Sequence, residues 1–320
     1  MDHAQLEREG ELLSIQGLIP NTAAYLGAYR RLFARAVNGL YDPQARQLVL
    51  NQSISSLESE NAVFAHELFH AAQDLTWGIE PPPQSRQSYD AKIARLAFFE
   101  ADATLQSWVD LEVTSALPPP TTIEAIAARI ATVSAEEQDA IPAYIYQLFL
   151  HIYQEGLYFF ARRARQGESW SEIRRSYATP PESSAVLMGA DLPAGERAAP
   201  LDCPTPPPPL QLRWSSPLGR LHWLILLSSQ IGAREARAIT QAWRMEVSCL
   251  MRGVRGSYAC TISRWHDMRS ALQFADAIRL YAQGARLPLA LSTLDSELRF
   301  CFGSKRSEEL TAALAAMTTD

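Results

Sequence analysis

Clusters of proline divide this chain of 320 residues more sharply than any other feature of its sequence. They fall at positions 81–83, 118–120, 180–181 and 206–209. Because proline has no backbone N–H and a fixed φ angle, it cannot continue the interior of a helix or of a central strand. Each regular element must therefore lie within one of five segments. The whole length corresponds to about two ordinary domains or one large domain.

The composition is that of a folded globular protein, with 47% hydrophobic and 20% charged residues and a net charge of −6. This excludes wholesale disorder. The acidic balance argues against binding to nucleic acid, which needs a basic face. No stretch approaches the roughly 18 apolar residues of a membrane span. The N-terminus lacks the basic and apolar pattern of a signal peptide, so we expect a cytoplasmic protein.

The four cysteines, Cys203, Cys249, Cys260 and Cys301, are widely spaced and include no CxxC pair. In a chain of this size without a secretion signal, reduced thiols are the usual state of such residues. We therefore expect four reduced and mostly buried thiols, with neither disulfides nor a metal at these positions.

Hydrophobic periodicity predicts an α+β fold that is mainly helical. In the first part of the chain we expect helices at 23–37, 59–75, 88–113 and 121–166, and a short strand at 47–51. Residues 183–204 read as a loop. After the last proline cluster we expect helices at 218–229, 234–243, 268–283 and 308–317, and strands at 245–251, 258–263 and 298–302. The predicted division is a metal-binding region at 1–205 and a C-terminal α/β portion at 210–320, packed as one unit.

The motif that carries chemistry is HExxH, within the helical sequence NAVFAHELFHAAQDL. Since His66 and His70 are four residues apart, both imidazoles project from one face of the helix and can reach one ion. Zinc accepts imidazole nitrogen in a tetrahedral shell. Glu67 lies about 100° around the helix, where it can act as general base on a water. The alternative is a helix with two packed histidines and an unrelated glutamate.

Two histidines need a third protein ligand, and Glu100 is our candidate. It lies on the apolar face of the predicted helix at 88–113, where a carboxylate is costly unless it is paired or bound to metal. An arginine partner such as Arg95 is the alternative. Asp74 follows His70 by four residues, so it either accepts the second imidazole N–H or solvates the helix end. We expect Asp102 to be a structural hydrogen-bond acceptor.

These motifs, HELFHAAQD (66–74) and EADAT (100–104), resemble HELxHALQD and EGDAT of a bacterial family of largely uncharacterised zinc metallopeptidases of gluzincin type. YATPPESSAVLM (177–188) resembles a later segment of that family. The resemblance implies a zincin-like core with a short sheet, zinc bound by His66, His70 and Glu100, and Glu67 as catalytic glutamate. This chain departs from the family at Ala185 and Gly189, where the family has glutamate and histidine.

The sequence thus predicts a zinc-dependent metallopeptidase, a hydrolase acting on a peptide or protein substrate. One alternative is a catalytically weak or inactive zincin-derived protein with a binding or regulatory role, motivated by the departures at Ala185 and Gly189. Another is a helical scaffold with a fortuitous motif. A peptidase also needs a donor for the oxyanion. The sequence does not single one out, and it does not indicate the oligomeric state. The candidates for that donor are His151, His222, His266, Tyr158, Tyr177 and Arg220.

Overall fold

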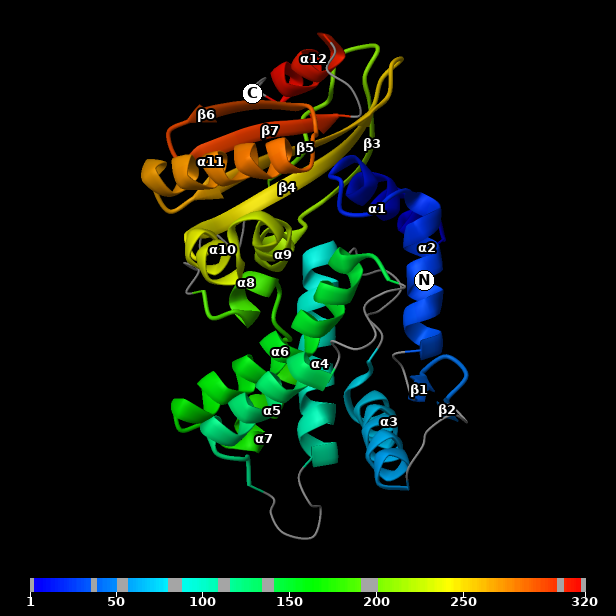
Figure 1. The fold of residues 1–320 in the computed structure, drawn as a ribbon. Coiled ribbons are helices and arrows are strands. Elements are labelled where there is room, and N and C mark those ends of the chain that lie inside the picture. Colours follow the sequence, from blue (N-terminus) through cyan, green and yellow to red (C-terminus); the bar gives the residue numbers. More distant parts are fainter. Residues whose placement is uncertain are drawn as a thin grey trace.

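The computed structural model describes residues 3–35, 39–50, 57–79, 88–108, 116–133, 141–190, 201–303 and 308–317. Figure 1 shows a group of helices below a sheet, which is flanked by further helices. The α+β, mainly helical fold that we predicted is confirmed. The proline cluster at 81–83 and the predicted element ends at 36–37, 51 and 109–113 lie outside the described residues.

The N-terminal part consists of helices around a two-stranded hairpin. Its elements are α1 (His3–Ile15), α2 (Thr22–Arg35), β1 (Gly39–Asp42), β2 (Gln47–Leu50) and α3 (Leu57–Trp77). The two strands pair antiparallel. Helix α1 was not predicted from the sequence. The predicted helix at 59–75 corresponds to α3, and its HExxH motif lies in the middle of that helix.

The central helix of the lower group is α4 (Tyr89–Trp108), which packs against α6 (Ala143–Arg165). Gly156 of α6 allows this close approach, because a Cβ atom there would lie 2.1 Å from the carbonyl oxygen of Ala97. The region predicted as helical at 121–166 forms two helices, α5 (Pro120–Val133) and α6. The packing buries almost the whole length of α4 and so fixes the position of any side chain that it carries.

Short helices connect this group to the sheet. They are α7 (Trp170–Arg174), the 3₁₀ turn η2 (Arg175–Tyr177), α8 (Ser184–Leu187), α9 (Gly219–Ile231) and α10 (Ala233–Thr240). A capping box of Ser169 and Glu172 begins α7. The segment predicted as a loop at 183–204 includes α8, and its residues 191–200 lie outside the described part.

The larger sheet has five antiparallel strands in the order β3-β4-β5-β7-β6. The strands are β3 (Gln211–Ser216), β4 (Trp243–Arg252), β5 (Ser257–Trp265), β6 (Leu289–Leu294) and β7 (Glu297–Gly303). Both edge strands, β3 and β6, are additions to the sequence prediction.

Helices cover both faces of this sheet (Figure 1). On one face, α11 (Met268–Gly284) and α9 bury Phe274 and Trp223 against Phe300. On the other face, α12 (Glu308–Ala316) packs on a separate apolar cluster. The first face belongs to a hydrophobic cluster that continues into the helical part as far as Leu12.

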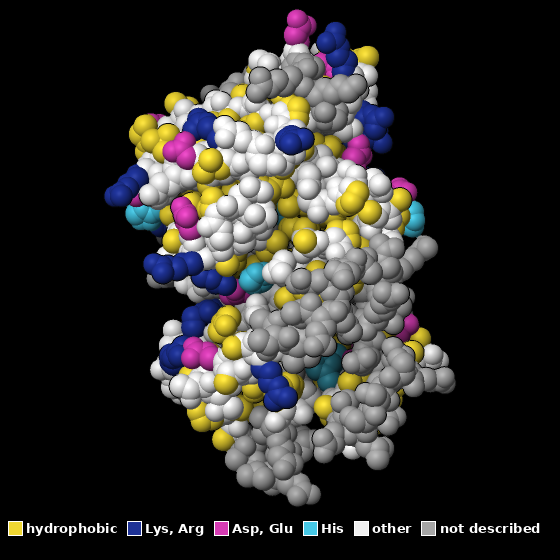
Figure 2. Space-filling model, in the orientation of Figure 1, with side chains coloured by type: hydrophobic (Ala, Val, Ile, Leu, Met, Phe, Trp, Pro, Cys, Tyr) yellow, Lys and Arg dark blue, Asp and Glu magenta, His cyan; other side chains and the backbone are white. Residues whose placement is uncertain are grey.

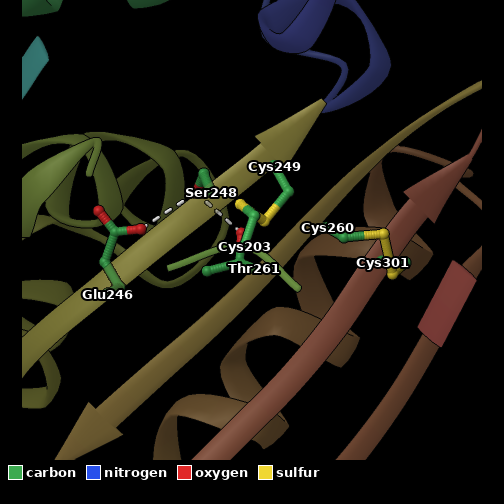
Figure 3. The surroundings of a disulfide bond; sticks show 7 residues. All are labelled: Cys203, Glu246, Ser248, Cys249, Cys260, Thr261 and Cys301. Atoms are coloured by element: carbon green, nitrogen blue, oxygen red, sulfur yellow. Dashed lines mark hydrogen bonds between the residues drawn. A yellow bond between two sulfur atoms is a disulfide. The ribbon is translucent and has the colours of Figure 1, made fainter. Parts of the chain in front are cut away.

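The cysteines correct our expectation of four reduced thiols. Cys203 is bonded to Cys249, and Cys260 is bonded to Cys301 (Figure 3). Cys249, Cys260 and Cys301 are register partners on β4, β5 and β7. Disulfides persist in oxidising environments. Their presence removes the support that reduced thiols gave to a cytoplasmic location, and it favours an oxidising compartment.

Among the described helices, none has both the length and the apolar character needed to cross a bilayer.

Candidate metal centre

Two adjacent helices bring the three predicted ligands together. His66 and His70 lie one turn apart on α3, and Glu100 lies on α4. Oε2 of Glu100 is 3.1 Å from Nε2 of His66 and 3.4 Å from Nε2 of His70. The two Nε2 atoms are 3.0 Å apart. All three side chains are partly buried, so the donor atoms form a small triangle with limited solvent access.

The size of this triangle suits a zinc ion. With bonds of about 2.0–2.1 Å, neighbouring ligand atoms of a tetrahedral shell are separated by about 3.3–3.4 Å. The three observed separations are close to that edge length. Two imidazoles and one carboxylate are also a donor set that zinc accepts, with a fourth position left for water or substrate. The residues present therefore fit the metal that the sequence predicted.

Glu67 is buried, and it lines the same cavity as the three ligands. Its Oε2 accepts a hydrogen bond of 2.7 Å from the backbone N–H of Tyr41 on β1. Gly39 lets β1 approach α3 this closely, since a Cβ atom there would lie 2.8 Å from Cγ of Glu67. Burial raises the pKa of Glu67 above its ordinary value, although the two histidines oppose the shift. A raised pKa suits a carboxylate that must take up and release a proton near neutral pH.

Gln73, one turn after His70, fixes the orientation of that histidine. The carbonyl oxygen of Phe99 can only accept a hydrogen bond, and it lies 3.0 Å from Nε2 of Gln73. The other end of the amide, Oε1, therefore faces Nδ1 of His70 at 2.7 Å and accepts a hydrogen bond from its N–H. With the hydrogen on Nδ1, the neutral imidazole directs the lone pair of Nε2 towards the position of the ion.

A buried hydrogen-bond chain supports Gln73 from behind. The amide Nε2 also donates to the hydroxyl of Tyr177, which in turn donates to Asp102. Asp102 is fully buried and also accepts from Trp170 and Arg174. It is thus the structural acceptor that we predicted.

For Asp74 the sequence left two roles open, as acceptor for the second N–H of an imidazole or as a group that solvates the helix end. For His70 that acceptor is Gln73. The carboxylate of Asp74 instead accepts from the hydroxyl of Tyr41 and from the backbone N–H of Ile79. It therefore links α3 to β1 and to the residues that follow the helix.

The charges at the site favour a cation. Burial disfavours the imidazolium of His70, but the adjacent Glu100 carboxylate outweighs this effect and raises the pKa of His70 to about 9. Burial also opposes ionisation of Glu100, yet the two histidines lower its pKa far below the ordinary value. At neutral pH the proton on His70 therefore balances the charge of the Glu100 carboxylate, and a bound metal ion would replace that proton.

An apolar cavity of about 330 Å³ opens beside the candidate ligands. Its wall combines β1, α4 and α6, and includes Leu96, Phe99, Leu148 and Ile152. Figure 2 shows recessed histidine atoms between the positions that α3 and α4 take in Figure 1. A second, smaller cavity of about 230 Å³ shares His66, Phe149 and Tyr153 with the first.

Tyr153 lines both cavities and was not predicted as a site residue. Burial raises its pKa well above the ordinary value, and the Glu100 carboxylate, to which its hydroxyl donates, adds to the shift. Its ring centroid is 6.5 Å from that of His66. A neutral hydroxyl at this position is a donor close to the ligands.

The sequence left six candidates open for the oxyanion donor, and none of them is among the described residues that line the two cavities. Tyr177 belongs to the hydrogen-bond chain behind Gln73. His222 is buried and bonded to Tyr144. His266 is exposed beside Asp267, while His151, Tyr158 and Arg220 lie in the electrostatic field of Glu155.

The two positions at which the chain departs from the resembling family also lie away from these cavities. Ala185 of α8 is fully buried in the hydrophobic cluster. Gly189 has a φ of +84°, and a Cβ atom there would lie 2.9 Å from Nε of Arg162. Ala185 therefore serves packing, and Gly189 leaves room for the Arg162 side chain.

No family model, no curated protein and no solved structure matches the chain.

Proposed function

We propose that this protein is a zinc-dependent metallopeptidase, as its resemblance to the gluzincin-type family implies. The observation that carries the proposal is the convergence of His66, His70 and Glu100 within 3.0–3.4 Å, beside a buried glutamate of raised pKa. A fortuitous HExxH motif does not require a carboxylate from another helix to complete a zinc-sized triangle.

Zinc held by these three side chains would supply Lewis-acid chemistry and lower the pKa of water. Glu67 is the base that accepts a proton from the attacking water and then delivers it to the leaving amine. Its hydrogen bond from the Tyr41 N–H holds the carboxylate in place between those two steps. The Tyr153 hydroxyl donates to Glu100; turned from that carboxylate to a substrate oxygen it would stabilise the oxyanion, which makes it our candidate for this role.

The cavity favours a peptide substrate with a bulky apolar side chain next to the scissile bond. Its wall is almost entirely apolar apart from the residues of the site itself. Burying an apolar side chain there removes its surface from water and contributes binding free energy. The second cavity on the other side of His66 leaves room for the substrate chain to continue.

The test combines metal analysis with a peptide-library cleavage assay. Purified protein is expected to contain about one zinc ion per chain, and His66→Ala is expected to lose it. Glu67→Gln is expected to retain zinc and to lose cleavage by a factor of about 10² or more, because the base is removed while the ligands remain. Glu235→Gln, an exposed glutamate on α10, is the matched control. Equal cleavage by Glu67→Gln and wild type would rule out the proposed mechanism.

A further inference from the structure

A buried arginine without a partner lies at the junction of the helical group and the sheet. Arg220, in the first turn of α9, is only 4% exposed. Its Nε has no hydrogen-bond partner, and its side chain forms no ion pair with a described residue. A guanidinium remains charged at neutral pH, and a buried charge is costly unless another group compensates it.

Two more arginines surround the same point, together with a single carboxylate. Arg237 of α10 donates to Oε1 of Glu155, and Arg162 of α6 donates to the carbonyl oxygen of Leu187. Burial lowers the pKa of Arg220 to about 10; Glu155 opposes the shift, while Arg237 and Arg162 reinforce it. The three guanidiniums therefore lie close enough to act on one another through their charges.

The charges of this cluster do not balance. Among the described residues, three guanidinium groups interact through their charges with one carboxylate, that of Glu155, which is almost fully buried. His151 is 3.8 Å from Glu155, but burial lowers its pKa and keeps it neutral. Counted over the part of the chain that the structure describes, the cluster thus carries two positive charges in excess. Figure 2 shows Lys and Arg side chains gathered on the margin of the molecule at the height of α10 and below it.

We propose that Arg162, Arg220 and Arg237 form a binding site for a small dianion of the phosphate class. A dianion would neutralise the excess charge and supply the acceptors that the Arg220 side chain lacks. Planar guanidinium groups suit such a ligand, since each can donate two parallel hydrogen bonds to one oxyanion. Arg237 is 39% exposed, which gives the ligand a route from solvent.

Gly189 is part of this arrangement. The Arg162 side chain packs against its backbone, and any Cβ atom would meet Nε at 2.9 Å. Because Gly189 has no Cβ atom, the Arg162 guanidinium can lie against its backbone. The proposed site is separate from the metal centre and does not depend on peptidase activity.

The experiment measures thermal unfolding of the full chain in millimolar inorganic phosphate, with sodium chloride and sodium acetate at equal ionic strength as references. At these concentrations the general salting effect of phosphate is small. Phosphate at about 100 times its dissociation constant is expected to raise the Tm of a chain of this length by about 4 °C. Acetate, a monoanion, is expected to give less than half of that rise.

Two variants locate the effect. Arg220→Met is expected to abolish the phosphate-dependent rise and, since it removes an uncompensated buried charge, to have a higher Tm than wild type in chloride alone. The control is Arg234→Met, at an exposed arginine one turn before Arg237 on α10, and it is expected to keep the full phosphate-dependent rise in Tm. Absence of a rise in wild type, an equal rise in Arg220→Met, or an equal effect of acetate would overturn the proposal.

Equilibrium dialysis with radiolabelled phosphate provides a measurement that does not depend on how Arg220→Met folds. Wild type is expected to bind one phosphate per chain. Arg220→Lys keeps the charge but loses the planar pair of donors, so it is expected to bind about tenfold more weakly. Binding by Arg220→Lys with unchanged affinity, or no saturable binding by wild type, contradicts the assignment.

Discussion

The amide of Gln73 determines which nitrogen of His70 carries the proton. Its Nε2 is held by Phe99 and Tyr177, so its Oε1 must accept from Nδ1. Gln73→Leu removes that acceptor and is expected to weaken zinc binding about 10–100-fold. Asp74→Asn is the matched control, since Asp74 contacts Tyr41 and Ile79 instead, and it is expected to bind zinc like wild type.

Zinc affinity is measured by competition with a chromophoric chelator, with far-UV circular dichroism to confirm the fold. If Asp74→Asn weakens zinc binding as much as Gln73→Leu does, the orienting role belongs to Asp74, as the sequence alone suggested.

At the candidate site, the residues that could be predicted are those that stand out by their spacing along the sequence. His66 and His70 are one helical turn apart, and Glu100 is a carboxylate in an apolar stripe, so each is visible in a one-dimensional pattern. Gln73 and Tyr153 gave no such signal. Their importance comes from partners at a distance in the sequence, Phe99 for one and Glu100 for the other. Neither residue type is unusual on a helix that faces a core.

At the scale of elements, the substrate preference depends on the apolar wall that α4 and α6 form together. Leu96 of α4 lines that wall and is still 42% exposed, so it can be replaced without emptying the core. Leu96→Lys is expected to reduce cleavage at peptides with bulky apolar residues by about tenfold or more relative to other peptides. The physical reason is the charge that it places where the apolar side chain would bind.

The control for this change is Leu68→Lys on α3, since Leu68 is 51% exposed and does not line the cavity. A peptide library read by mass spectrometry gives the preference of each variant. Cleavage with no apolar preference in wild type would refute the substrate class while leaving the peptidase mechanism standing; no cleavage by any variant would instead count against the mechanism.

The strands that could not be predicted, β3 and β6, are those whose burial depends on the elements packed around them. Strand β6 is half-buried along most of its length and β3 is largely exposed, so neither shows the alternation expected of a strand with one buried face. The disulfides were missed for a related reason. Cys260 and Cys301 are 41 positions apart, and only the register of β5 and β7 makes them adjacent.

For the molecule as a whole, two buried carboxylates join the helical group to the sheet. Asp90, at the start of α4, accepts from the backbone N–H of Ser184. Glu246 of β4 accepts from the N–H groups of Leu218 and Gly219, at the start of α9. Gly219 has no side chain and a φ of +86°, so the Asp90 carboxylate can lie directly against its backbone. The helix that carries Glu100 is thus tied at its other end to the C-terminal portion.

These carboxylates should make global stability depend on pH. Burial raises the pKa of Asp90 to about 6 and that of Glu246 to about 8. Each folded-state pKa lies above the ordinary value, so the folded protein holds protons that the unfolded chain has already lost. Their contribution is complete below pH ~4 and is lost as the pH rises towards 8, with a slope of up to about 1.4 kcal/mol per pH unit for each proton.

Glu246→Gln isolates the larger of these two effects. A glutamine can accept from the two backbone N–H groups through Oε1 and donate to Ser248 through Nε2, so it preserves the contacts that the protonated acid makes. Between pH 6 and 8, the unfolding free energy of the variant is expected to fall less steeply than that of wild type, and at pH 8 the variant should be the more stable protein. Urea unfolding at four pH values measures this, with the exposed Glu235→Gln as control. Parallel plots of unfolding free energy against pH for Glu246→Gln and wild type would mean that Glu246 is ionised in the folded protein. The N–H groups at the start of α9 would then stabilise the carboxylate by more than burial destabilises it.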